Sequence, residues 1–526
     1  MHRPPFRSGA HPAWRQGWAT ALVLAFPLFS LVSDVAIGLA GFLFLFSACL
    51  WWRDCVRVLR AHWPCTRWVL LAFLLHLACV LWLAAGRTHG ANAVDAPARM
   101  CIACSAMLVV QAGRPPLRFL WLGAASGALL GAVFVGWQRL ALGMERPGGL
   151  LNPITFGDLS LCLALLALAG AFVTRQGRVR WMAALGTVAG LAASLLTGSR
   201  GGWLALPAAF VLLAAARRRL LLPRRLLLGV PLLACALALG AYALPQTGVR
   251  ARIAVGVSDV RLYLADSPVA TSIGVRLDLW QAGLRLAAEH PWRGLDTPAY
   301  KRRMRAWVAA GELSPAVFAP PEPPHMHNDA LQALVTRGIP GLCAWIGILL
   351  APYLFFRTQL LRATGPGPRQ SAALAGMLVV LAYAAFGLSE VIFWSMKGSL
   401  FYALMVFLLM GWCLGGVDAG ADDSANANAN ANANADTGAN AAQAIGTAVS
   451  GQARPGPVPA GPRAAGGRAC RRVSVSGNGP RRPAAPSARA RSRMRRAPRR
   501  RRTPQASHSA RPKSSATAVG SSGQVA

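Results

Sequence analysis

Acidic residues are scarce in this chain: 18 Asp and Glu stand against 55 Lys and Arg, which gives a formal net charge of +37 over 526 residues. Such a balance is common in nucleic-acid-binding proteins, where basic residues cluster on one face. No loop or expected helix here interleaves basic and aromatic residues as a nucleic-acid surface would. We therefore expect no nucleic-acid partner, and the positive charge needs another explanation.

Charged residues of both signs are also few, at 14% of the chain, whereas 54% of its residues are hydrophobic and the mean hydropathy is +0.41. A soluble domain of this size is less apolar. The composition therefore predicts an integral membrane protein. The N-terminus has no convincing small-residue cleavage site, so the first apolar run is expected to be an uncleaved span.

Twelve apolar segments approach the ~20 residues that a membrane-crossing helix needs. They lie near residues 18–34, 35–52, 68–85, 97–112, 119–138, 157–174, 181–197, 202–216, 226–244, 329–356, 371–389 and 398–415. We therefore expect an all-α, polytopic membrane protein of about twelve transmembrane helices. Helices 1–9 would occupy residues 18–244 and helices 10–12 residues 329–415.

The distribution of basic residues tests this count. The N-terminal segment 1–17 and the connections on its side of the membrane hold 20 basic residues, whereas the short connections on the other side hold six. Lys and Arg concentrate in the cytoplasmic connections of membrane proteins. The alternation predicts that both termini are cytoplasmic and that the connection 245–328 lies outside the cytoplasm.

The connection 245–328 is long for a loop without a function. It contains no cysteine, which excludes a structural disulfide. In its middle, Leu277, Trp280 and Leu284 recur at helical spacing. We expect an amphipathic helix with these three residues as its apolar face, ending before Pro291 and lying on the membrane or capping the bundle.

Residues 416–526 have a different composition, with Ala-Asn repeats followed by a stretch rich in Pro, Ala, Arg and Ser. The segment holds 18 Lys and Arg against four Asp, and too few apolar residues to form a core. We expect a disordered basic cytoplasmic tail. Its arginine run 499–502 could rest on anionic lipid, but a dispensable tail is the preferred interpretation.

The segment 197–203 (TGSRGGW) places Arg200 among small residues at the junction of two expected spans. A guanidinium in such a place can bind phosphate in a bidentate manner, and the N–H groups of the following helix add positive partial charge. The alternative is an interfacial arginine beside a glycine turn. The segment alone supports both interpretations equally.

Asn152 and Pro153 open the sixth expected span, and Asp158 follows in its first turn. A helix start explains most of this pattern. Contact of Asn152 or Asp158 with sugar hydroxyls is the less favoured interpretation.

His325 and His327 directly precede the tenth expected span. Histidine is suited to general-base catalysis near neutral pH. Asn328 or Asp329 can cap the helix, which would hold His327 just beyond its N-terminus. A His-x-His pair can also bind zinc, but no further ligand with usable spacing lies nearby, so we expect no metal.

Glu390 lies at the outer end of the eleventh expected span. An ionisable group near the membrane is a functional candidate by default. Pairing with Lys397 is the alternative.

Three of these segments together resemble the bacterial O-antigen ligase family: residues 152–157, 197–205 and 325–342. The spacing of Arg276, Trp280 and the His290-Pro291 pair before the histidine motif is similar to that family as well. The resemblance covers roughly residues 18–415, and the tail has no counterpart in it.

The resemblance implies a C-type glycosyltransferase fold in the bacterial inner membrane, with a large helical periplasmic loop between helices 9 and 10. It also implies transfer of a glycan from undecaprenyl diphosphate to lipid A–core oligosaccharide without metal or cofactor. By position, His327 is the expected general base, and Arg200 and Arg276 the diphosphate-binding residues. One base, and no glycosidase-type carboxylate pair, predict inversion. Further substrate-binding candidates are His325, Asn328 and Asn152.

The same superfamily contains O-antigen polymerases and O-linked protein oligosaccharyltransferases, and both remain alternatives. Protein-directed relatives tend to carry more extracytoplasmic sequence after the last spans, which the tail expected here does not match. A membrane transporter is less favoured, because no internal repeat is visible and the histidines lie at the interface instead of mid-membrane.

Overall fold

The computed structural model describes residues 13–85, 90–174, 176–220, 224–264, 271–318 and 325–415, all of which lie in one compact unit. Residues 1–12 and the expected basic tail 416–526 lie outside the described residues. Within these ranges every regular element is a helix and no strand occurs. The expectation of an all-α protein is confirmed for this part of the chain.

The regular elements follow one another in a simple order. They are α1 (Ala13–Phe29), α2 (Ala36–Leu50), α3 (Trp52–Ala84), α4 (Gly90–Ile102), α5 (Cys104–Gly113), α6 (Arg118–Leu140), α7 (Pro153–Val173), α8 (Gly177–Leu196), η1 (Gly201–Leu204), α9 (Ala205–Leu220), α10 (Arg224–Ala243), η2 (Pro245–Thr247), α11 (Val249–Leu264), α12 (Ser272–Glu289), α13 (Thr297–Ala309), η3 (Pro315–Phe318), α14 (Asp329–Arg362), α15 (Pro368–Phe386), η4 (Ile392–Trp394) and α16 (Met396–Leu414).

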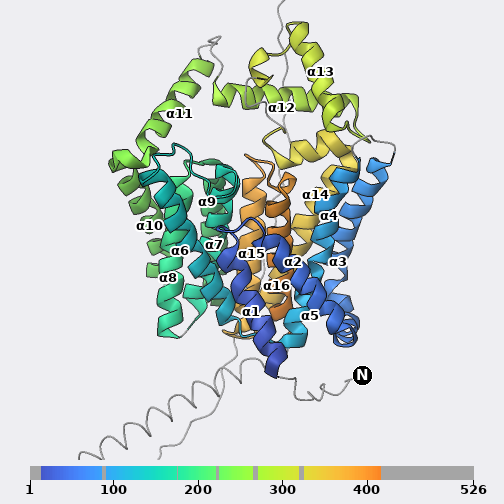
Figure 1. Ribbon diagram of the computed structural model, residues 1–526, viewed down its shortest axis with the longest axis vertical. Helices are drawn as coiled ribbons and strands as arrows, with labels where there is room; N and C mark the ends of the chain where they lie inside the picture. Colours follow the sequence, from blue (N-terminus) through green and yellow to red (C-terminus); the bar gives the residue numbers. More distant parts are fainter. Residues whose placement is uncertain are drawn as a thin grey trace, which may run out of the picture. The chain divides into compact units, whose positions relative to one another are not determined.

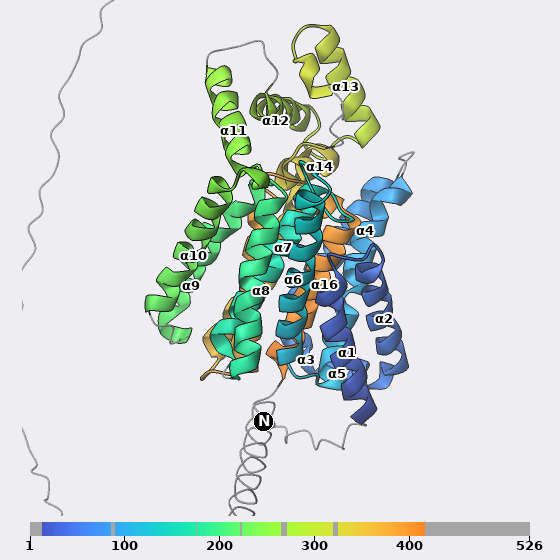
Figure 2. The same ribbon diagram turned by 60° about the vertical axis from the view of Figure 1, so that its left-hand side comes forward.

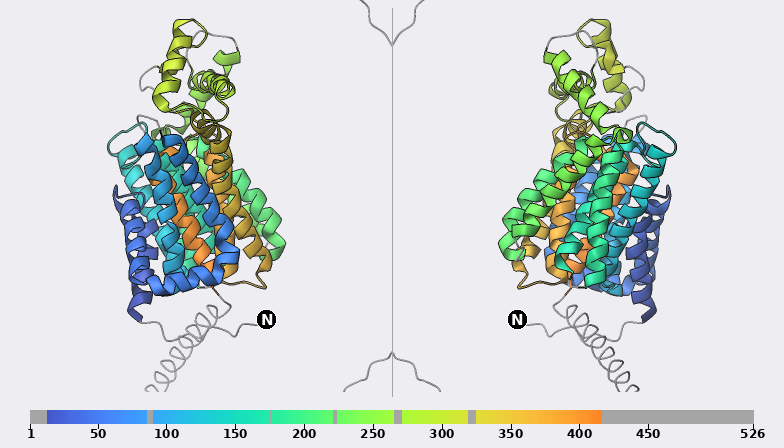
Figure 3. Two further views of the ribbon diagram at one scale, coloured as in Figure 1. Left: turned by 90° about the vertical axis from the view of Figure 1, so that its right-hand side faces the viewer. Right: turned by 90° about the vertical axis from the view of Figure 1, so that its left-hand side faces the viewer.

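The long helices form a bundle around α7, α15 and α16, whose apolar segments are the most deeply buried (Figure 1). The helices α9 and α10 run along its edge, as the turned view in Figure 2 shows. At one end of the bundle, α11, α12 and α13 lie together beyond the long helices (Figure 3). The connection 245–328 is therefore largely helical and gathered at a single end.

Eight helices of the described residues are long and apolar enough to cross a membrane. The chain is thus a multi-pass membrane protein in composition and length. Each of the twelve expected segments coincides with a helix, but α1, α2 and α9 have only 17, 15 and 16 residues, and the apolar part of α10 is restricted to Pro231–Ala243. The count of twelve spans stays a prediction.

The helix α3 is longer than the sequence led us to expect. It begins at Trp52, so residues 53–67, which were expected to form a connection, are helical. Pro64 lies inside this helix without ending it. Arginines and exposed tryptophans alternate along this first half, and Trp52, Trp63 and Trp68 are 59%, 43% and 64% exposed. Such side chains suit a membrane interface better than a loop in water.

The helix α12 buries a face that differs in part from the one its sequence suggested. Leu284 is 60% exposed, whereas Leu279, Ala282 and Leu286 lie in a small core. Of the expected apolar face, Trp280 packs against this core, whereas Leu284 is exposed, so packing on α13 buries this face only in part. The reason is α13, which supplies Tyr300, Met304 and Trp307 to that core and so selects the face that α12 buries.

Polar caps begin the helices around this end of the bundle. The side chains of Asn152, Thr271, Asp296, Asn328 and Ser395 each accept a backbone N–H in the first turn of α7, α12, α13, α14 and α16. A cap of this kind contributes ~1 kcal/mol. The start of each of these helices, and the direction of the segment before it, is thereby defined.

The helix α14 is broken near its start. Gly338 has φ +65° and ψ −164°, a conformation outside the helical region that glycine alone adopts readily. On either side of it, the N–H of Ile339 donates to Pro291 (2.7 Å) and the N–H of Leu295 donates to Val335 (2.8 Å). These two hydrogen bonds hold the chain that follows α12 against α14 at the break. The break separates a short first segment of α14 from the long span that follows it.

Candidate active site

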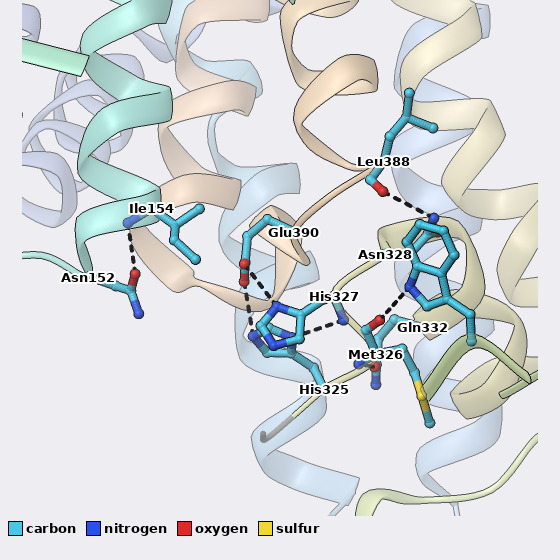
Figure 4. A network of polar contacts seen from close by, with 10 residues as sticks. Asn152, Ile154, His325, Met326, His327, Asn328, Gln332, Leu388 and Glu390 are labelled. Atoms are coloured by element: carbon cyan, nitrogen blue, oxygen red, sulfur yellow. Dashed lines mark hydrogen bonds and ion pairs between the residues drawn. The ribbon is translucent and has the colours of Figure 1, made fainter. Parts of the chain in front are cut away.

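A carboxylate and two imidazoles meet where α14 begins. His325 Nε2 lies 3.0 Å, and His327 Nδ1 3.2 Å, from the two carboxylate oxygens of Glu390. The two rings lie edge to face with centroids 4.6 Å apart, and Figure 4 shows both directed at Glu390. Glu390 is only 7% exposed and belongs to the segment that follows α15. Residues far apart in the chain thus form one polar cluster.

Hydrogen bonds from two directions hold the backbone of the histidine motif. Trp280 Nε1 of α12 donates to the carbonyl of Met326 (3.0 Å), and the N–H of Met326 donates to Oε1 of Gln332 on α14 (2.9 Å). His327 has φ +52°, a region that few non-glycine residues occupy. Such strain costs ~1–3 kcal/mol and persists only where its surroundings impose it. The motif is therefore rigidly supported.

The charge of Glu390 determines how the imidazole protons are arranged. Burial raises the pKa of Glu390, but hydrogen bonds from His325 and His327 outweigh burial and bring the pKa to about 2. The carboxylate is therefore ionised at neutral pH and only accepts hydrogen bonds. The nitrogens that face it, His325 Nε2 and His327 Nδ1, must carry protons.

The two histidines differ in which of their ring nitrogens are hydrogen-bonded. His325 Nδ1 accepts the backbone N–H of His327 at 3.3 Å, so both ring nitrogens of His325 are used. His327 Nε2 has no partner among the described residues. With Nδ1 protonated, this nitrogen is the one that can accept a proton. The side chain of His327 is 22% exposed, against 11% for His325.

Two arginines converge on the cluster from other elements. Arg200 lies between α8 and η1, and Arg276 lies near the start of α12, one turn before Trp280. Burial lowers the pKa of Arg276, which lies within electrostatic reach of both Glu390 and Arg200. None of the ion pairs within the described ranges includes either arginine. Two neighbouring guanidinium groups are thus available to an anion.

Close backbone packing holds the Arg200 segment near Glu390. A side chain at Gly201 would clash with Ser389, and one at Gly202 would clash with the buried carboxyl of Asp158. Gly256 of α11 similarly makes room for the guanidinium of Arg200. From the sequence, Gly201 and Gly202 were expected only to form a turn or to lie beside a phosphate, and Gly256 was not singled out.

Asn152 and Asn328, which were expected to bind substrate, each cap a helix. Asn152 Oδ1 accepts the N–H of Ile154 at 2.9 Å as the cap of α7, and Figure 4 shows it apart from the histidines. Asn328 Oδ1 accepts the N–H of Leu331 at 3.0 Å, and its Nδ2 donates to Leu388 at 3.4 Å. These contacts occupy Oδ1 of Asn152 and both polar atoms of Asn328.

One alternative from the sequence is wrong. Lys397 does not pair with Glu390, because its ammonium contacts Asp34 in the connection between α1 and α2. Glu390 pairs with the histidines instead. The sequence also did not indicate Trp280 and Gln332 as supports of the motif. Trp280 was noted only for its apolar character and its place in the family-like spacing, and Gln332 carried no signal beyond its position one turn after the histidines.

The cluster also bears on metal binding. Ligand atoms of His325, His327 and Glu390 all lie within 4.8 Å of one another, so the three side chains could hold a metal ion. Sequence spacing offered no such third ligand, because Glu390 follows 63 residues after His327. Direct hydrogen bonds already satisfy the carboxylate, so the geometry does not require an ion.

Comparison with known proteins shows which family this part of the chain is similar to. A family model described as O-antigen ligase matches residues 183–346. An uncharacterized protein of Haemophilus influenzae is 21% identical over 346 residues, which cover 65% of this chain and 85% of that relative. The matched segment includes both arginines and both histidines of the site, whereas Glu390 lies beyond it. Residues 183–346 of this membrane protein are therefore similar to the O-antigen ligase family.

Proposed function

We propose that this protein is an O-antigen ligase of the bacterial inner membrane. It transfers a glycan from undecaprenyl diphosphate to lipid A–core oligosaccharide at the periplasmic face, where the connection 245–328 would lie, with both termini cytoplasmic. The fold would be of the C-type glycosyltransferase class. The observation that carries the proposal is the contact of Glu390 with His327 beside two unpaired guanidinium groups.

The chemistry assigned to each residue follows from charge. The acceptor hydroxyl oxygen attacks the anomeric carbon, and its proton passes to Nε2 of His327. The bond between the anomeric carbon and the diphosphate oxygen breaks, and the negative charge that develops on the diphosphate is stabilised by Arg200 and Arg276. Glu390 stabilises the imidazolium that forms, as a buried carboxylate does behind a catalytic histidine. The displacement is in line and inverts the anomeric configuration.

His325 is a positioning residue in this scheme, because Glu390 and the backbone of His327 occupy its two nitrogens. Asn328 contributes by fixing the start of α14. A role for Asn152 in sugar binding would have to use its amide nitrogen, because its oxygen caps α7.

The reaction is proposed to need no metal. Two guanidiniums supply the positive charge that a divalent cation supplies in many phosphate enzymes. Transfer that survives prolonged EDTA treatment, by protein whose metal content is below one ion per chain, supports this. Loss of transfer with EDTA and recovery with one divalent cation would instead assign the three-residue cluster to that cation.

Reconstitution into proteoliposomes tests the function. The purified protein is given undecaprenyl diphosphate-linked glycan and one of three acceptors: lipid A–core, a second lipid-linked glycan or a Ser/Thr-containing protein. Glycan transfer to lipid A–core, lost in His327→Ala, is expected. Transfer only to the second lipid-linked glycan or only to protein would identify a polymerase or a protein-directed transferase and overturn the ligase assignment.

A further inference from the structure

A cavity of about 500 Å³ lies beside the histidine cluster, between α3, α4, the start of α14 and the segment that leads to α16. Its volume falls within the ~300–1,000 Å³ typical of small-molecule sites. The lining residues used below are His76, Ala96, Asp329, Gln332, Arg337 and Trp394. Neither Arg200 nor Arg276 lines it.

Buried polar atoms at this cavity lack partners. His76, Asp329 and Gln332 are 4%, 2% and 2% exposed. Their atoms Nδ1, Oδ2 and Nε2, respectively, have no hydrogen-bond partner in the part of the chain that the structure describes. Buried polar groups are nearly always hydrogen-bonded, so three unsatisfied side chains among the residues that line one cavity favour a polar occupant, toward which these side chains could turn.

The charges around the cavity indicate which kind of occupant fits. Arg337 lies within electrostatic reach of His76 and Asp329. A guanidinium and a carboxyl group of opposite formal charge therefore face the same space, together with an amide and an imidazole. This mixture offers both donors and acceptors of hydrogen bonds, as the hydroxyls of a sugar require.

The cavity is connected to the catalytic cluster through shared residues. Trp394 lines the cavity, and its ring lies 6.3 Å from the ring of His325. Gln332 also lines the cavity, and its Oε1 accepts the backbone N–H of Met326. Asp329 follows His327 by two residues. An occupant would thus lie next to the residues that support the histidine motif, in a cavity that neither Arg200 nor Arg276 lines.

We propose that this cavity is the acceptor subsite, in which the hydroxyl-bearing sugars of a membrane-anchored glycan bind before transfer. The inference rests on the proposed function and adds to it separate binding sites for donor and acceptor. Arg200 and Arg276 hold the diphosphate donor, and the residues around His76, Gln332 and Arg337 hold the acceptor.

Filling the cavity tests this assignment. Ala96→Phe places a ring at its wall, whereas Ala98→Phe on the same helix serves as the matched control, because Ala98 is also half-buried but does not line the cavity. Initial rates are measured with lipid A–core varied at fixed donor, and the reverse. Ala96→Phe is expected to raise the KM for lipid A–core about tenfold, the scale of a modest steric misfit, and to leave the KM for donor unchanged. A raised KM for donor alone would overturn the assignment.

A second measurement needs neither turnover nor a bulky substitution. Ala93→Cys introduces a thiol at an exposed position of the cavity lining. Its alkylation by a maleimide, measured above the labelling of the parent chain, should be slowed by lipid A–core but not by undecaprenyl diphosphate. Protection by undecaprenyl diphosphate alone, or by neither lipid, would refute the acceptor subsite. Absence of transfer by the parent protein with every acceptor would instead refute the proposed function.

Discussion

The carboxylate of Glu390 lies 3.2 Å from Nδ1 of His327, although 63 residues separate them in sequence. This contact fixes which imidazole nitrogen faces the open side of the site. It joins the segment after α15 to the start of α14, and a backbone hydrogen bond from Asp329 to Gly387 (2.8 Å) reinforces the same junction. The geometry of the proposed base thus depends on two separate spans being packed together.

Glu390→Gln should reduce glycan transfer by ~10²–10⁴-fold, because an amide cannot stabilise the imidazolium as a carboxylate does. Initial rates in proteoliposomes measure the effect, with protein amount and thermal unfolding as checks on folding. Lys397→Met is the matched control, since Lys397 contacts Asp34 instead of the cluster. Equal rates for Glu390→Gln and the parent protein would contradict the role given to this carboxylate.

Substitution of the two histidines should lower the transfer rate by different amounts. His327→Ala removes the proposed base and should cost ~10²–10⁴-fold in rate, the usual contribution of a general base. His325→Ala removes a hydrogen bond to Glu390 and a support of the His327 backbone, so a smaller loss is expected. Single-turnover transfer by both purified variants decides the order. A larger loss in His325→Ala would reverse the assignment.

Arg276→Ala should lower the transfer rate by ~10²–10³-fold, the typical effect of removing one donor to a developing anion. Arg276→Lys should recover only part of the rate, because an ammonium does not reproduce the planar fork of a guanidinium. The control is Arg285→Ala on the same helix. Arg285 pairs with Glu312 (2.7 Å), and exposed pairs contribute little. Similar losses at both positions would indicate that α12 is merely destabilised.

The pKa of Glu390 predicts how stability changes in acid. Its value of about 2 lies below the ordinary 4.5, so the ionised carboxylate stabilises the folded state above pH 4.5. This contribution is lost progressively as the pH falls from 4.5 towards 2. Between pH 6 and pH 3, the melting temperature of the detergent-solubilised parent protein should fall further than that of Glu390→Gln. Parallel curves for the two proteins would exclude this linkage.

Gly338→Ala should destabilise the fold by ~1–3 kcal/mol or more, because φ +65° with ψ −164° is a glycine conformation. An added Cβ would also clash with the backbone of Pro291 and Trp292. Gly347→Ala in the same helix is the control, since its Cβ would lie 3.8 Å from Ala72. Thermal unfolding of both variants makes the comparison, and equal melting temperatures would show that the break tolerates a side chain.

Apolar runs sufficed to locate the long helices of the bundle, because burial in lipid or in the bundle requires long hydrophobic segments, but they did not indicate the first half of α3 or the helices α11 and α13. Contacts between residues far apart in the chain were harder to predict from the sequence. The sequence offered only Lys397 as a partner of Glu390, and the packing of α15 on α14 is what brings Glu390 to the histidines. The buried face of α12 depends on α13, so Leu284 could not be recognised as exposed from local spacing.

The site residues could likewise be predicted only in part from the sequence. The sequence suggested His327, Arg200 and Arg276, since their residue types suit the proposed chemistry. It could not indicate that Oδ1 of Asn152 is occupied as a helix cap, because the same residue type serves capping and recognition. The cavity beside His76 had no sequence signal, since a single histidine in an apolar run is usually a core residue.

One consequence concerns how the protein could be inhibited. The helix α12 packs Leu279 and Leu286 against α13, while Trp280 on another face holds the histidine motif. We therefore expect a binder that displaces α13 to disturb α12, and with it Arg276 and the support of the histidine motif. Such a binder would act through the connection 245–328 and would not need to occupy the site of either lipid.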